Sequence, residues 1–170
     1  MLQNLKIYGA IILSMICWAF SFIWTKVAVE SFQPVTLVTL RLIIASVLLF
    51  AYVKVTKKFQ IIRTEDLKWF ILLAFFEPYL YYMGETYSLT VLSPTFVAVM
   101  IATIPLFAPL FAFIFLKERI SRMNILGVVI SLLGVMLVIY DPSKGLNGDF
   151  WGVMLVFVAV FAAVSYTVVS

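Results

Sequence analysis

The sequence contains no histidine and a single cysteine, Cys17, among its 170 residues. Histidine is the commonest general base and metal ligand, so its absence argues against zinc or haem sites and against histidine-based catalysis. A lone cysteine cannot form an intrachain disulfide. The sequence also offers no nucleophile–base pair and no phosphate-cradling loop. We therefore expect no metal, no cofactor and no enzymatic activity.

Charged residues are scarce: they make up 12% of the chain, whereas hydrophobic residues make up 65% and the mean hydropathy is +1.15. Soluble domains contain about 25% charged and about 45–50% apolar residues. The composition therefore predicts an integral membrane protein embedded in a lipid bilayer. The excess of 12 basic over 8 acidic residues would suggest a nucleic-acid partner in a soluble chain, but the basic residues here cluster in loops. We expect them to report membrane orientation, and we expect no nucleic-acid partner.

Long apolar runs predict membrane-spanning helices along the whole chain. The first run is not followed by a convincing cleavage site, so we interpret it as a retained span and not as a signal peptide. The sequence thus predicts an all-α integral membrane protein, a multi-span helical bundle. The predicted spans are 7–29, 35–53, 69–92, 95–116, 123–140 and 150–170.

The third predicted span carries two carboxylates, Glu77 and Glu85. An ionisable side chain at membrane depth costs about 2.5–3.5 kcal/mol even on lenient scales and normally faces a bundle interior or a water-filled cavity. At about 100° per residue, one helix face collects Glu77, Tyr81, Glu85 and Ser88. Two interpretations stay open for each carboxylate. In the first, the group is structural and is either permanently neutral or salt-bridged. In the second, it belongs to an aqueous transport pathway.

Glu77 lies about 12 Å from the start of its span, near the middle of a hydrocarbon core about 30 Å thick. Burial favours a neutral carboxyl, so a change of solvation between inward and outward states would load or release a proton. We hypothesise that Glu77 is the proton-coupling group. The predicted substrate-binding residues are Trp18, Ser21, Glu77, Tyr81, Tyr82, Glu85 and Thr103.

Two basic residues, Lys26 and Arg41, also lie inside predicted spans. Arg41 is about 10 Å from the start of its helix, at a depth similar to that of Glu85. An arginine does not stay unpaired there, so we predict an ion-pair cluster of Lys26, Arg41 and Glu85. The sequence leaves open whether this cluster is a structural clamp or an anion-binding site. It also leaves open whether Lys26 instead extends to the membrane surface.

Prolines inside the spans predict helix kinks at Pro78, Pro105 and Pro109, because proline lacks the N–H that would bond the preceding turn. The fourth span also has a face of small residues. We expect this distorted helix to pack against the third span beside a cavity, with a simple packing kink as the alternative. In the fifth span, Gly127 and Gly134 predict close helix packing.

Basic residues are concentrated in the loops of one side of the membrane. The opposite loops contain only Lys144. This asymmetry predicts a multi-pass protein of the cell inner (plasma) membrane with a cytoplasmic N-terminus. The nine residues on the basic side are Lys6, Lys54, Lys57, Lys58, Arg63, Lys68, Lys117, Arg119 and Arg122.

The sixth span weakly repeats the first, since Tyr8-Gly9 aligns with Trp151-Gly152 and Trp18-Ala19 with Phe161-Ala162. Five spans separate the two starts, so the second copy must insert upside down, which is typical of inverted-repeat transporters. We expect the chain to be truncated, with its C-terminal module missing. The predicted organisation is a first five-helix module at 7–140, a periplasmic linker at 141–149 and the first helix of a second module at 150–170.

Several short motifs occur in a specific order along the chain. They are Trp18 and Lys26, then Pro34, Arg41 and Ala45, then Ser88 to Thr95, Pro105 and Pro109, Leu116-Lys117-Glu118-Arg119, Gly127 and Gly134-Val135. In this order and spacing the chain resembles the EamA-type permeases of the drug/metabolite transporter superfamily. The sequence departs from the family pattern at Ala19, where glycine is common, and at Pro94, where a small residue is usual. Glu77 and Glu85 are not part of that pattern, so their roles rest on the membrane argument.

The resemblance implies a ten-helix transporter with both termini cytoplasmic and a central cavity between two inverted modules. It implies that spans one, three, four and six line this cavity. We expect a secondary transporter that moves a small metabolite or amphipathic compound by alternating access, with proton coupling as a further hypothesis. The alternatives are a half-size protein that works only as a homo- or hetero-oligomeric assembly, with a second copy or a separate module, and a non-transporting membrane scaffold.

Overall fold

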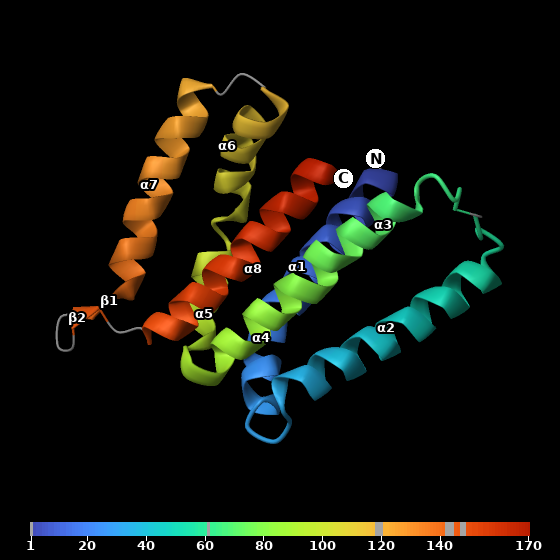
Figure 1. Cartoon of the computed structure of the whole chain (residues 1–170), viewed down its shortest axis with the longest axis horizontal. Coiled ribbons are helices and arrows are strands. Elements are labelled where there is room, and N and C mark those ends of the chain that lie inside the picture. The colour runs from blue at the N-terminus through green and yellow to red at the C-terminus, as the bar shows by residue number, and fades with distance from the viewer. Residues whose placement is uncertain (1, 61, 118–120, 142–144, 147–148) are drawn as a thin grey trace.

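The computed structural model describes residues 2–60, 62–117, 121–141, 145–146 and 149–170, which form a bundle of helices (Figure 1). Glu118, Arg119 and Lys144, which the sequence analysis singled out, lie outside the described residues. The helical elements are α1 (Leu2–Ala28), α2 (Pro34–Val55), α3 (Leu67–Ala74), η1 (Phe75–Leu80), α4 (Tyr81–Val91), α5 (Pro94–Ile101), α6 (Ile104–Leu116), α7 (Arg122–Ile139) and α8 (Phe150–Val169).

Four described segments are long and apolar enough to cross a membrane: Ile7–Ala28, Pro34–Val55, Pro94–Phe115 and Phe150–Val169. The third predicted span is not among them because it is divided into α3, η1 and α4. A short antiparallel ladder, β1 (Tyr140–Asp141) with β2 (Gly145–Leu146), follows α7 and is a small exception to the helical architecture. The predicted fold class, an all-α membrane bundle, is confirmed.

Local sequence explains where two of the helices begin. The Ser93 hydroxyl accepts a hydrogen bond from the Phe96 N–H at 3.3 Å, and Pro94 occupies the first turn of α5. The Asp149 carboxylate likewise accepts from the Trp151 N–H at 2.8 Å at the start of α8. Such caps satisfy N–H groups that have no partner inside the helix, which matters most where no water is available.

The core of the bundle lies where α4, α5 and α8 meet. In Figure 1, α8 runs through the middle of the bundle, with α6 and α7 on one side and α3 and α4 on the other. It packs against α4, α6 and η1. Most of the deeply buried apolar residues come from these central helices, among them Leu89, Val97, Ile101, Val156, Val160 and Val164.

Glycines allow α4 and α8 to approach closely. A Cβ atom added at Gly84 would lie only 2.7 Å from the carbonyl oxygen of Leu155 and 3.1 Å from the Cβ of Ala159. A Cβ atom at Gly152 would lie 2.6 Å from a methyl carbon of Val91. Small residues at such crossings let helix backbones pack tightly inside a membrane.

The close packing predicted at Gly127 and Gly134 is not observed among the described residues, because a Cβ atom at either position would have nothing within 4 Å. The reason is the position of α7, which lies at the edge of the bundle (Figure 1). Its small-residue face therefore has no tightly packed neighbour there.

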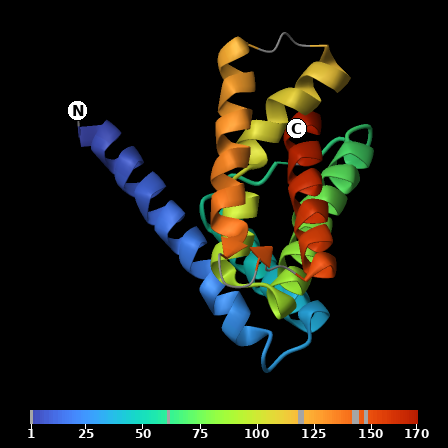
Figure 2. The same cartoon turned by 90° about the vertical axis from the view of Figure 1, so that its left-hand side faces the viewer.

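The first two helices contact the bundle mainly through the C-terminal end of α1 and the N-terminal end of α2, which the α1–α2 loop connects. Phe22 and Thr25 of α1 and Val38 of α2 are buried, whereas the N-terminal half of α1 extends away from the other helices (Figure 2). Both views place the N- and C-termini toward the same end of the molecule. The α2–α3 connection, which contains Lys57, Lys58 and Arg63, also lies at this end, and the α1–α2 and α4–α5 connections lie at the other.

Candidate functional site

The third predicted span is interrupted at Glu77. The backbone of Glu77 is extended, with φ −138° and ψ 117°, between two helical stretches. Pro78 follows and has no N–H to donate to the carbonyl of Ala74, so the regular helical bonding is lost at this point. Irregular backbone at membrane depth is tolerated where it is buried in protein or lines a water-filled cavity. The break therefore places a half-buried carboxylate on unwound backbone.

The polar face predicted on this span continues through α4. Tyr81, Glu85 and Ser88 are 4%, 1% and 0% exposed, and the Ser88 hydroxyl donates a hydrogen bond to the Glu85 carbonyl at 2.7 Å. The even helical spacing that was assumed for this face ends at the break. Glu77 therefore does not extend the face as a straight helix would.

The fourth predicted span is also divided, because α5 ends at Ile101 and α6 begins at Ile104. Pro105 lies in the first turn of α6, where it cannot donate to the carbonyl of Ile101. Pro109 lies inside α6 without interrupting it. The interruption of this span is thus next to Pro105. Thr103, in the break, is buried and donates its hydroxyl hydrogen to the carbonyl of Met100 at 2.5 Å.

Arg41 of α2 faces Glu85 of α4. Its Nη1 atom lies 3.8 Å from Oε1 of Glu85, and the two side chains are 31% and 2% exposed. The guanidinium carbon also lies 4.2 Å from the ring centroid of Tyr82. Within the described part of the chain, neither Arg41 Nη1 nor Glu85 Oε1 has a hydrogen-bond partner. The contact is therefore electrostatic, since 3.8 Å is too long for a hydrogen bond.

Lys26 does not join this pair in the described structure. Its ammonium group donates to the carbonyl of Leu89 at 2.6 Å and to that of Thr90 at 3.4 Å. These carbonyls belong to the last turn of α4, where they lack helical partners and where a cation complements the helix dipole. In place of the predicted three-residue cluster, the structure has an Arg41–Glu85 pair and a separate lysine cap.

Three of the predicted substrate-binding residues, Tyr81, Tyr82 and Glu85, lie together on α4. The Tyr81 ring packs against that of Tyr82 with centroids 5.4 Å apart, and Glu85 is one helical turn further along. Trp18 packs on Phe22 of its own helix, with ring centroids 5.5 Å apart. Ser21 and Thr103, which were also predicted, each donate a hydrogen bond to the backbone carbonyl three residues earlier in the chain. Ser21 donates to the carbonyl of Trp18 at 2.6 Å.

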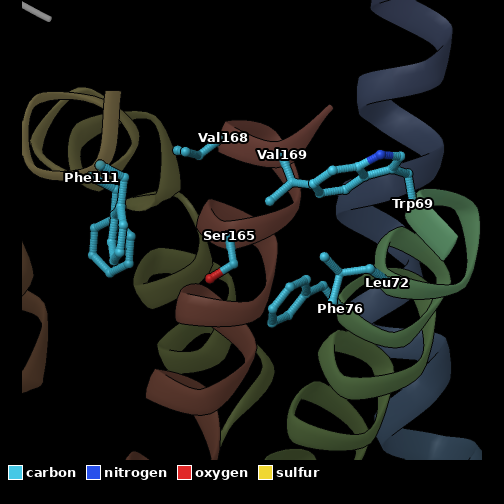
Figure 3. A pocket seen from close by; sticks show the side chains of 8 residues that line it. Trp69, Leu72, Phe76, Phe111, Ser165, Val168 and Val169 are labelled. Atoms are coloured by element: carbon cyan, nitrogen blue, oxygen red, sulfur yellow. The ribbon is translucent and has the colours of Figure 1, made fainter. Parts of the chain in front are cut away.

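A cavity of about 500 Å³ lies near the end of the bundle that contains both termini (Figure 3). Small-molecule sites are typically about 300–1,000 Å³ and mostly apolar, with a few polar groups, as this one is. Its polar groups are the Ser165 hydroxyl and the Trp69 indole N–H. The lining residues come from α3, η1, α6 and α8: Trp69, Leu72, Phe76, Phe111, Phe115, Ser165, Val168 and Val169.

None of these lining residues was predicted from the sequence to bind substrate. Phe76 precedes Glu77, and this proximity to a charged residue was the only available signal. Phe111 and Phe115 are four residues apart and share a helix face, but in an apolar span such a pair looks the same whether it faces lipid or a cavity.

A second cavity, of about 330 Å³, lies between α1 and α5. Thr95, Ala98 and Ala102 of the small-residue face line this cavity and face α1, while the fourth span also contacts α4 of the third span, as expected. Spans three, four and six thus share the larger cavity, and span one contributes to the smaller one. The residues around the second cavity are Ala19, Phe22, Ile23, Pro94, Thr95, Ala98, Val99 and Ala102.

These features define a class of protein: a multi-pass helical membrane protein with two interrupted spans beside an apolar cavity. Comparison with known families identifies the class further. The chain belongs to the EamA-like transporter family, whose profile matches residues 5–140. The predicted family resemblance is therefore confirmed.

The chain is similar to several curated proteins. An uncharacterized transporter of Archaeoglobus fulgidus is 30% identical over 167 residues, which cover 96% of this chain and 56% of the relative. The uncharacterized transporters YdfC and YoaV of Bacillus subtilis are 26% and 27% identical, over 89% and 78% of this chain and 49% and 46% of their own lengths. The chain thus spans about half the length of these relatives. No solved structure matches it.

Proposed function

We propose that this protein forms one module of a secondary transporter, which moves a small metabolite or amphipathic compound by alternating access. The observation that carries the proposal is the unwound backbone at Glu77, beside Phe76 of the 500 Å³ cavity. Discontinuous membrane helices near the midplane form the substrate and ion sites of many transporters. Membership of the EamA-like transporter family supports the same conclusion.

The larger cavity provides a route from one end of the bundle to the break. Its lining begins with Trp69, near the start of α3, and reaches Phe76 about 10 Å further along the helix. The apolar walls with a hydroxyl and an indole N–H suit a solute that has an apolar body and a polar group.

Glu77 is the group we propose to couple transport to protons. It is half-buried and lies on backbone that is not held by regular helical bonding. A small change in the packing of α3 against α4 would therefore change its contact with water. A carboxyl that alternates between wet and dry surroundings binds a proton in one state and releases it in the other.

The distribution of basic residues supports an orientation with the N-terminus cytoplasmic, in the inner membrane. In this orientation the larger cavity lies toward the cytoplasm, and the Arg41–Glu85 pair and Lys26 lie toward the outer face.

We further propose that residues 7–140 form one module, that 141–149 is a periplasmic linker and that α8 begins an inverted second module. Such a module, on this or another chain, would complete the transport pathway. The family profile ends at residue 140, and the curated relatives are about twice as long as the matched region. Packing of α8 against α4 and α6 supports an interface of this kind.

Proteoliposome uptake of a panel of metabolites, with and without a pH gradient, tests the proposal. We expect Glu77→Gln to abolish pH-gradient-driven uptake and to leave exchange or facilitated flux, because the amide cannot carry the proton. Glu65→Gln is the matched control, since Glu65 is exposed in the loop before α3. Unchanged pH dependence in Glu77→Gln would remove Glu77 from the mechanism. Absence of uptake of every solute, when the second module is also present, would argue against transport itself.

A further inference from the structure

We propose that Glu85 and Tyr82 form a binding site for an organic cation, an ammonium or guanidinium group, which the side chain of Arg41 occupies in this structure. The inference deepens the proposed function, because it assigns a positive charge to the transported solute. It concerns binding, however, and is tested without any measurement of transport.

The first observation is the incomplete pairing of Glu85. Its side chain is only 2% exposed, so an ionised carboxylate there needs a nearby positive charge. Arg41 supplies that charge at 3.8 Å, but within the described residues Oε1 of Glu85 and Nη1 of Arg41 both lack a hydrogen-bond partner. Arg41 therefore compensates the charge of Glu85 but makes no hydrogen bond to its Oε1 atom.

The second observation is the aromatic surface beside the carboxylate. The guanidinium carbon of Arg41 lies 4.2 Å from the ring centroid of Tyr82, whose ring packs against that of Tyr81. A carboxylate next to the face of an aromatic ring recognises organic cations by charge and by the ring quadrupole together. An ammonium or guanidinium group of a solute would make the same two contacts as Arg41.

The third observation is the difference in exposure between the two partners. Glu85 lies on the α4 face that is buried against neighbouring helices, whereas the Arg41 side chain is long and 31% exposed. The Arg41 side chain therefore has room to move out of the pair, whereas that of Glu85 has none. A cation that enters therefore exchanges with Arg41, and Glu85 keeps a partner throughout.

The other charged and titratable groups around the site fit this exchange. Glu77 of η1 lies in the same interrupted span, and Lys26 of α1 is held by the carbonyls at the end of α4. On the side of α4 that faces α8, the residues nearest to Gly84 are Leu155 and Ala159, which carry no charge. Arg41 is thus the cation in position to compete for Glu85.

The test uses methylguanidinium as the probe and methylurea, its neutral analogue of similar shape, as the control solute. Binding to the purified full chain in detergent is measured by the saturable rise of the thermal unfolding temperature. We expect Arg41→Met to bind methylguanidinium at least about tenfold more tightly than the wild type, because the tethered competitor is gone. We expect Glu85→Gln to bind it more than about tenfold more weakly. Methylurea should produce no saturable rise.

Equal affinity of Arg41→Met and the wild type, or undiminished binding by Glu85→Gln, would overturn the proposal. If Arg41→Met does not fold, Tyr82→Leu decides the question, since it removes the ring and retains the ion pair. We expect it to weaken methylguanidinium binding relative to the wild type, and equal binding would overturn the proposal. Transport can fail while binding is observed, so the two proposals are tested separately.

Discussion

At the scale of single residues, the ion pair of Arg41 and Glu85 affects stability in a characteristic way: replacing one partner lowers the free energy of unfolding more than replacing both. Removing one partner of a buried pair leaves an uncompensated charge, which typically costs about 3–5 kcal/mol. Replacing both partners by neutral groups avoids that cost. The Glu85 carboxylate is the more deeply buried of the two, so its isolation has the larger effect.

We expect Arg41→Met to lower the free energy of unfolding by about 3 kcal/mol, and the double variant Arg41→Met/Glu85→Gln to recover most of this loss. Denaturation in detergent micelles measures both values. Lys54→Met, at an exposed position near the end of the same helix, is the control and should change stability little. A double variant as unstable as the single one would show that Arg41 stabilises the fold by packing and not by charge.

Lys26 stabilises the fold through backbone carbonyls. We expect Lys26→Met to lower the free energy of unfolding by about 1 kcal/mol, because the carbonyls of Leu89 and Thr90 lose a cationic donor at a helix end. Lys58→Met, in the exposed loop after α2, is the control for loss of a positive charge. Equal stability of the two variants would argue against the cap.

At the scale of elements, the crossing of α4 and α8 depends on the absence of a side chain at Gly84. We expect Gly84→Ala to lower the free energy of unfolding by about 1–3 kcal/mol, because its methyl group would overlap the backbone of α8. Gly127→Ala is a matched control, since a Cβ atom there has nothing within 4 Å. It should be neutral or slightly stabilising. A neutral effect of Gly84→Ala would mean that the two helices separate without cost.

The break in the third span should depend on Pro78. We expect Pro78→Ala to restore an N–H to the helix, to favour a continuous helix through Glu77 and thereby to reduce uptake strongly in a folded protein. Pro109→Ala is the matched control, because Pro109 lies within an uninterrupted α6. Proteoliposome uptake measures the effect, together with the reactivity of Ser165→Cys toward a water-soluble thiol reagent. Full activity of Pro78→Ala would show that the break is not needed for transport.

At the scale of the whole molecule, the proposed orientation places the two ends of the bundle on opposite sides of the membrane. In a Cys17→Ala background, we expect Phe32→Cys to react with a membrane-impermeant thiol reagent in intact cells. Phe59→Cys should react only after permeabilisation. Both positions are exposed in loops, so access to the reagent depends on the side of the membrane. The opposite pattern would invert the orientation.

Much of the architecture was predictable because membrane insertion is governed by local sequence. Apolar length and the bias of basic loops predicted an all-α membrane bundle, and the order of short motifs predicted the family. The site was less predictable. The burial of Tyr81 and Glu85 on one helix face followed from helical spacing, but the cavity lined by Phe76, Phe111 and Phe115 has no local signal.

The amino-acid sequence by itself determined that this chain is a helical membrane protein and predicted the buried position of Glu85. Hydrocarbon admits only segments that satisfy their own backbone, and it penalises isolated charges. Only the tertiary structure decided that Arg41 pairs with Glu85 whereas Lys26 binds helix-end carbonyls, and which spans surround each cavity. Those outcomes depend on distances between helices, which packing at contacts such as Gly84 against Leu155 sets and which no single span encodes.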